Sequence, residues 1–262
     1  MLLLKLLLAP ALVVGSSLAG RRWGARVTGV LVALPIVAGP ILLISCLEHG
    51  TRFGAAAAAS SLLGLVTLAL FAVVFAWFSR RAGAILSLAV TWAACLAADV
   101  ALAQVQVSPW VGFPVVLLAA WGASRVLARG TVSPGAPLLT TRPWWDLPGR
   151  AAATASLVVL VTSLAGALGP AMTGVLAPFP IATSVVAAFT LAQAGHAQTV
   201  QVLRGILTGL LGFTVFCLLV ALLVDRVGVA AGFGVAGAGT LLTQVAWQLA
   251  TGRGPARGLR PS

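Results

Sequence analysis

One acidic residue of this chain lies inside a long apolar segment, where ionisable side chains are rare. Asp99 stands in LSLAVTWAACLAADVALAQV and is one of only four Asp or Glu residues among 262. A carboxylate in such surroundings must be paired, hydrated or neutral, and intramembrane acids commonly bind protons or ions. Gln244 follows at an offset of 145 residues, in GTLLTQVAWQL. We expect Asp99 to bind a proton or cation beside Gln244; alternatively, Asp99 is neutral, bonds to a neighbouring helix or reaches the interface.

Two further polar residues end apolar segments at the same offset. Glu48 and Gln193 each stand two residues before a glycine, Gly50 or Gly195. An acid and an amide at these places could gate opposite mouths of a path through the protein. The alternative is that both are solvated turn residues.

Prolines interrupt the same two apolar segments at corresponding places. Pro35 and Pro40 lie in the first, and Pro178 and Pro180 in the second. Breaks at matched positions of two halves mark substrate or ion sites in transporters, because they free backbone groups within the membrane. Proline kinks are also ordinary in membrane helices. Pro35 and Pro180 are therefore candidate binding positions.

The composition places these residues in a membrane protein. The chain is 60% hydrophobic and 8% charged, with a mean hydropathy of +1.10, whereas soluble domains are about one-quarter charged. About 20 apolar residues in a helix cross a bilayer. Nine segments meet this requirement: 2–19, 26–47, 54–78, 83–104, 109–128, 150–168, 171–193, 200–224 and 228–250.

The basic residues predict the orientation. With nine spans, 13 of the 16 Lys and Arg residues fall on one side of the membrane. By the positive-inside rule this side is cytoplasmic, which puts the N-terminus outside and the C-terminus inside a bacterial plasma membrane. Trp144, Trp145 and Arg142 suit the cytoplasmic headgroup layer as anchors. A signal peptide cleaved after Ala19 is disfavoured, because arginines follow the first apolar segment rather than precede it.

The chain also repeats itself. Residues 28–83 align without a gap onto 173–228, with 14 of 56 positions identical and TGVLVALPI matching TGVLAPFPI. We expect an all-α polytopic protein with four-helix units at 1–106 and 150–252. Residues 107–149 add one linking helix and a cytoplasmic linker, and 253–262 form a basic tail. One helix between the units gives a 4+1+4 arrangement of inverted repeats.

The second unit carries a family resemblance. TGVLAPFPIATSVVAAFTLAQAGHAQTVQVLRGILTGLLGFTVF resembles the GlpM-like family of small bacterial inner-membrane proteins, and the first unit looks like a diverged copy. The resemblance implies a four-helix unit and no defined biochemical activity.

These features favour a secondary transporter or exporter of a small metabolite or lipid-like molecule, coupled to protons or cations through Asp99. The alternative is a non-transporting accessory subunit in envelope polysaccharide or lipid metabolism.

With two His, no Tyr and no catalytic or phosphate-binding motif, we expect no enzyme, metal or cofactor. The basic residues lie between apolar runs, so the expected partner is the bilayer and not nucleic acid. Either a homo-oligomer or a membrane partner subunit is compatible with the Gly- and Ala-rich faces.

Overall fold

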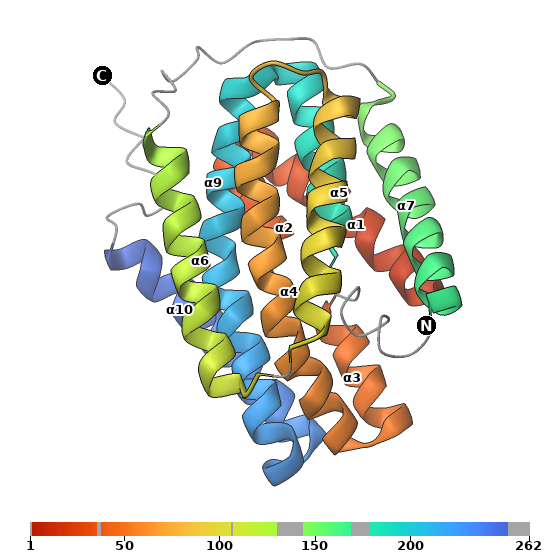
Figure 1. Cartoon of the computed structure of the whole chain (residues 1–262), viewed down its shortest axis with the longest axis vertical. Coiled ribbons are helices and arrows are strands. Elements are labelled where there is room, and N and C mark those ends of the chain that lie inside the picture. Colours follow the sequence, from red (N-terminus) through yellow and green to blue (C-terminus); the bar gives the residue numbers. More distant parts are fainter. Residues whose placement is uncertain (1, 36–37, 106, 130–143, 169–178, 251–262) are drawn as a thin grey trace.

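The chain folds into a bundle of helices (Figure 1). The computed structural model describes residues 2–35, 38–105, 107–129, 144–168 and 179–250, and all regular structure within them is helical. The helices are α1 (Leu2–Trp23), α2 (Ala25–Val32), α3 (Ala38–His49), α4 (Thr51–Phe78), α5 (Ala84–Ala103), α6 (Pro109–Arg129), α7 (Asp146–Leu168), α9 (Ile181–Val227) and α10 (Val229–Ala250). Five of them, α4, α5, α6, α9 and α10, are long and apolar enough to cross a membrane.

Two glycines of the repeat set helix boundaries. Gly50 precedes α4 with a φ of 90°, and Gly195 interrupts α9 with a φ of 76°. Glycine adopts positive φ without the steric penalty that a Cβ imposes. The boundaries predicted between residues 47 and 54 and between 193 and 200 are therefore confirmed, although α9 continues in the same element beyond its break.

Proline divides one segment that the hydropathy pattern joins. Residues 26–47, predicted as one span, are two helices, α2 and α3, with Pro35 between them. Proline has no backbone N–H and its ring clashes with the preceding turn, so α2 does not continue through it. Pro40 lies in the first turn of α3, where a missing N–H costs nothing. Pro180 stands just before α9, while Pro178 lies outside the described residues.

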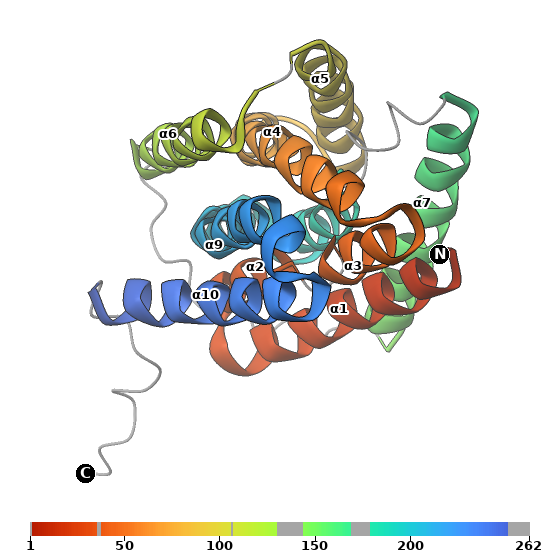
Figure 2. The same ribbon diagram turned by 90° about the horizontal axis from the view of Figure 1, so that it is seen from below.

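Helix α9 is the centre of the bundle. Figure 2 shows it between α2 and α10 on one side and α4 and α6 on the other, and its contacts with α2, α4 and α10 are the most extensive. The crossing with α2 brings backbones together, because a Cβ at Gly29 or Gly205 would meet the other helix's main chain. Small residues permit this approach in membrane proteins, where dispersion contacts hold helices together. Phe71, Phe75 and Leu203 fill the adjoining core.

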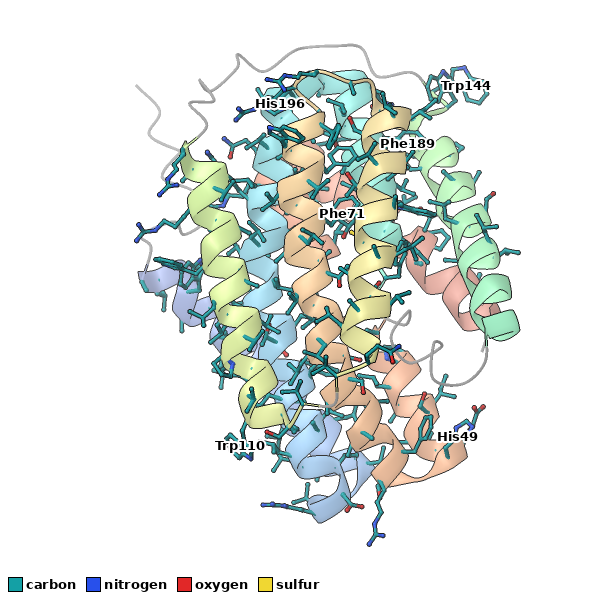
Figure 3. All side chains as sticks on the ribbon, viewed as in Figure 1. His49, Phe71, Trp110, Trp144, Phe189 and His196 are labelled. Atoms are coloured by element: carbon teal, nitrogen blue, oxygen red, sulfur yellow. The ribbon has the colours of Figure 1, made fainter. Side chains whose placement is uncertain are left out.

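The bundle has two chemically different ends. The hydroxyl of Ser79 lies 2.8 Å from Nδ1 of His196 at one end, and Thr51 donates to Asp225 over 2.7 Å at the other. Helix α4 and the second half of α9 are therefore antiparallel. Figure 3 shows His196 and Trp144 at the first end and His49 and Trp110 at the second. We call the first the arginine-rich end, after Arg80, Arg129, Arg150 and Arg204.

The α2–α9 crossing gives a stability prediction. Gly205→Ala should lower the free energy of unfolding by about 1–3 kcal/mol, because the new methyl group would meet the carbonyl oxygen of Arg26, which the helix holds in place. Gly234→Ala is the control, since nothing lies within 4 Å of its Cβ position. Thermal unfolding in detergent measures both variants. Equal midpoints for the two variants would contradict the close crossing.

Candidate functional site

Asp99 is buried between α4 and α5. Its side chain is 1% exposed, and the hydroxyl of Thr67 on α4 donates to its Oδ1 over 2.6 Å. Its second oxygen, Oδ2, is buried and has no hydrogen-bond partner among the described residues. An unpaired buried carboxylate oxygen is costly, and that cost falls sharply when the group carries a proton. The geometry therefore suits a neutral, protonated carboxyl group.

The sequence of α5 directs this acid inward. Ser87, Thr91, Cys95 and Asp99 recur every four residues, and all four are buried. Residues spaced by four lie on one face of a helix, so this small and polar stripe faces α4. Large apolar side chains such as Ile85, 87% exposed, cover the outer face. A helix with polar residues inward and apolar residues outward matches a lipid environment.

Helix α10 repeats this arrangement at the 145-residue offset. Its buried residues are Gly232, Ala236, Thr240 and Gln244, which correspond one by one to the buried stripe of α5. Nε2 of Gln244 donates to the carbonyl oxygen of Gly209 over 3.1 Å, and its Oε1 is buried without a described partner. Each helix thus ends its stripe on a polar side chain with one unsatisfied oxygen.

The residues that face Asp99 and Gln244 differ in size, and the smaller one faces the longer side chain. Thr67 faces Asp99, and the position that corresponds to Thr67 in the second unit is Gly212. A Cβ at Gly212 would lie 2.7 Å from Nε2 of Gln244, so glycine leaves space for the longer amide. Asp99 bonds to α4 and Gln244 bonds to α9, and no described hydrogen bond joins the two side chains.

The two candidate prolines occupy matching positions before a helix. Pro35 is half-buried in the break between α2 and α3, and Pro180 is buried before α9. The carbonyl oxygen of each accepts a backbone N–H bond of 2.8 Å from four residues later, Gly39 in one unit and Ser184 in the other. Both prolines therefore sit at breaks from which a helix starts.

Glu48 and Gln193 lie at opposite ends of the bundle. Glu48 is exposed at the end of α3. Gln193 is part of a polar network at the arginine-rich end, where its Nε2 donates to Asp146 over 2.7 Å and its Oε1 accepts from Arg150 over 3.3 Å. Gln193 is therefore a bonded residue of the fold and not a freely solvated one.

Asp146 is the centre of that network, although the sequence alone predicts no role for it. Its side chain is 0% exposed and forms 2.8 Å salt bridges with Arg150 of its own helix and with Arg21 of α1. With Gln193, the network joins α1, α7 and α9. The four-residue spacing of Asp146 and Arg150 could have indicated a helical ion pair. No local pattern points to Arg21 or Gln193.

Two of the three predicted interfacial anchors, Trp144 and Trp145, lie within the described residues. Trp144 is 88% exposed and Trp145 is 48% exposed, at the start of α7, while Arg142 lies outside the described residues. Cys46, Cys95 and Cys217 are free and buried. Among the described residues, no three His, Cys, Asp or Glu side chains gather in a way that could hold a metal ion.

We expect Asp99 to carry a proton in the folded protein in lipid, because its carboxyl group is buried and one of its oxygens has no described partner. Infrared spectroscopy of the protein in lipid would then show a protonated carboxyl band that Asp99→Asn removes. Asp225→Asn is the control, because Asp225 is exposed and close to Arg52. With only four acidic side chains in the chain, the assignment is simple. A band that survives in Asp99→Asn would contradict the neutral carboxyl group.

Asp146 should be a strong contributor to stability. Asp146→Asn leaves two arginines without their buried counter-charge and should lower the free energy of unfolding by about 3 kcal/mol. Asp225→Asn removes a half-exposed partner 3.9 Å from Arg52 and should cost about 1 kcal/mol or less. Chemical unfolding in detergent measures both. Similar losses in the two variants would show that the network does not lock the three helices.

The same network predicts a pH dependence. Asp146 precedes the predicted span that begins at residue 150. Burial alone would raise its pKa, but hydrogen bonds from Arg150, Gln193 and Arg21 outweigh burial and hold the pKa below the usual value. The resulting stability is fully present above about pH 4, the ordinary aspartate pKa, and is lost as pH falls through the lowered pKa. Asp146→Asn should flatten this acid-side loss.

Comparisons with known proteins assign no family to the chain. No protein-family model, no curated protein and no solved structure matches it. The buried polar residues and the internal repeat are therefore the features of the chain that bear on its function.

Proposed function

We propose that this chain is a multi-pass protein of a bacterial inner membrane that transports or exports a small metabolite or lipid-like molecule. Asp99 is the proton- or cation-binding residue in this proposal, and the unpartnered Oδ2 of Asp99 is the observation that carries it. A buried carboxyl group with an unsatisfied oxygen costs free energy in an apolar helix. Ion binding explains its presence there more readily than packing does.

The proposal includes nine spans in two inverted four-helix units. Its support is the equivalence of elements at the 145-residue offset. Helices α5 and α10 begin at Ala84 and Val229 and bury the same four positions, as described above. Helices α1 and α7 pack against each other, as do α4 and α9. Contacts between equivalent elements are what a pseudo-two-fold axis between the units would produce.

Helix α6 separates the two units along the chain, and this one additional span would give them opposite orientations in the membrane. An odd number of spans between two copies makes the second copy enter the membrane from the other side. In this arrangement the arginine-rich end faces the cytoplasm and the end with Arg52 and Asp225 faces outward, in accord with the positive-inside rule. The resemblance to the GlpM-like family is part of the same proposal and describes the four-helix unit only.

Asp99 and Gln244 occupy equivalent depths of the two units in this arrangement. A path that opens first toward one side and then toward the other would expose a protonatable group in one unit and an amide in the other. Pro35 and Pro180, at the helix breaks, would let the adjoining helices change angle. Binding and release of one proton at Asp99 would then accompany each cycle.

Transport assays with matched variants test the proposal. The full chain is reconstituted in proteoliposomes and screened against small organic anions, cations, amino acids and lyso-lipids under an imposed proton gradient. We expect at least one compound to show gradient-dependent flux that Asp99→Asn abolishes and that Asp225→Asn retains. Full gradient-dependent flux in Asp99→Asn would overturn the role of Asp99.

A second candidate function is an accessory or assembly subunit in envelope polysaccharide or lipid metabolism. The outward faces of α5 and α10 favour it, because large apolar side chains such as Ile85 and Leu242 are 87% and 69% exposed there and could contact a partner in the membrane. A partner that co-purifies reproducibly in mild detergent, with no flux for any compound of the panel, would favour this function over transport.

A further inference from the structure

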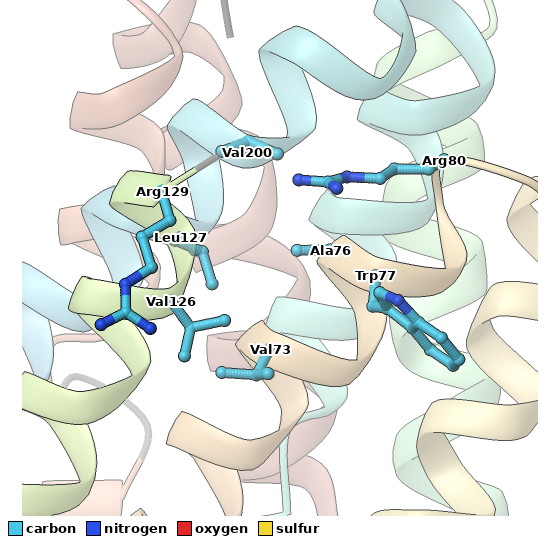
Figure 4. A pocket seen from close by; sticks show the side chains of 8 residues that line it. All are labelled: Val73, Ala76, Trp77, Arg80, Val126, Leu127, Arg129 and Val200. Carbon is cyan, nitrogen blue, oxygen red and sulfur yellow. The ribbon is translucent and has the colours of Figure 1, made fainter. Parts of the chain in front are cut away.

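A groove opens between α4 and α6 at the arginine-rich end. Figure 4 shows its walls, with Val73 and Trp77 on α4, Val126 on α6 and Val200 on α9, and its volume is about 300 Å³. Arg80 and Arg129 also line the groove. Arg80, in the turn that follows α4, extends toward Val200, and Arg129 runs along the α6 side (Figure 4). Two cations from different segments thus border one apolar hollow.

No acidic side chain of the protein neutralises these two arginines. The chain has four. Glu48 and Asp225 lie at the opposite end, Asp99 bonds to Thr67, and Asp146 is neutralised by Arg21 and Arg150. Arg204 adds a further cation beside the groove, where it donates to the carbonyl oxygen of Leu127 over 2.6 Å. The groove is therefore electropositive and could accept an anion.

The walls of the groove open to the side of the bundle. Trp77 is 57% exposed and Val126 is 50% exposed, and both belong to helices long and apolar enough to cross a membrane. Arg125 lies 4.7 Å from the ring centroid of Trp121, and Arg81 lies 5.8 Å from that of Trp77. Paired aromatic and basic side chains are typical of the headgroup layer. An occupant that enters from the bilayer is both anionic and apolar.

We propose that this groove binds an anionic phospholipid, with its phosphate on Arg80 and Arg129 and the first carbons of an acyl chain between Val73 and Val126. A volume of about 300 Å³ is at the small end for ligand pockets, so it holds a headgroup and the start of a chain and not a whole lipid. Basic pockets between membrane helices on the cytoplasmic side are suited to anionic headgroups. The proposal does not depend on transport through Asp99.

Native mass spectrometry of the delipidated full chain tests it, by titration with phosphatidylglycerol or with phosphatidylcholine of the same acyl chains. Arg80→Gln with Arg129→Gln should weaken phosphatidylglycerol binding roughly tenfold or more, at about 1 kcal/mol for each arginine near the membrane surface. The control, Arg52→Gln with Arg226→Gln, removes two exposed arginines at the opposite end and should change nothing. Equal phosphatidylglycerol affinity in the wild type and the Arg80/Arg129 variant would overturn the proposal.

A second variant separates a lipid from a free phosphate. Val126→Phe keeps both arginines but fills the apolar part of the groove, and its half-exposed position makes it independent of core folding. It should weaken phosphatidylglycerol binding and leave glycerol phosphate binding unchanged. Unaltered phosphatidylglycerol binding in Val126→Phe, or glycerol phosphate bound as tightly as the lipid, would overturn the assignment to a lipid.

Discussion

The hydrocarbon of a bilayer offers helices no gain from burying apolar surface, and this constraint accounts for the contacts of the bundle. Helices must instead associate through close approach and polar contacts. Gly29 and Gly205 let the backbones of α2 and α9 touch. The stripe that ends in Asp99 turns the small and polar residues of α5 toward α4, and the stripe that ends in Gln244 does the same for α10 against α9. Large apolar side chains remain on the outside of the bundle, as a lipid environment would favour.

The unsatisfied oxygens of Asp99 and Gln244 are informative for the same reason. Where water is absent, a polar atom without a partner costs free energy that packing alone does not return. Thr67 satisfies one oxygen of Asp99, and backbone carbonyls of α9 satisfy the amide nitrogen of Gln244. The other oxygen of each side chain has no described partner. By contrast, the carboxylate of Asp146 has a full set of cationic and amide partners. Asp146 therefore stabilises the fold, and Asp99 is the acid that we propose for proton or cation binding.

Much of the fold could be predicted because hydropathy, Gly and Pro act locally. Gly50 and Gly195 produce the expected breaks, and α4, α5, α6 and α10 lie where single apolar segments predict them, whereas α9 covers two predicted spans. The inward direction of Asp99 could also have been found, since three small or polar residues, Ser87, Thr91 and Cys95, precede it at intervals of four. The partners of Asp146 could not, because Arg21 and Gln193 come from distant parts of the chain and meet only when α1, α7 and α9 pack. The groove between α4 and α6 likewise exists only after packing.

If Asp99 binds and releases protons during transport, water must reach it in turn from both sides of the membrane, and thiol labelling at that position can measure this. Cys46, Cys95 and Cys217 are replaced, a single cysteine is introduced by Asp99→Cys, and a membrane-impermeant thiol reagent is applied from each side in turn to folded protein. We expect labelling from both sides, because alternating opening would carry water to the residue from each. Protection from both sides would mean that α4 and α5 stay closed around Asp99, and would contradict this expectation.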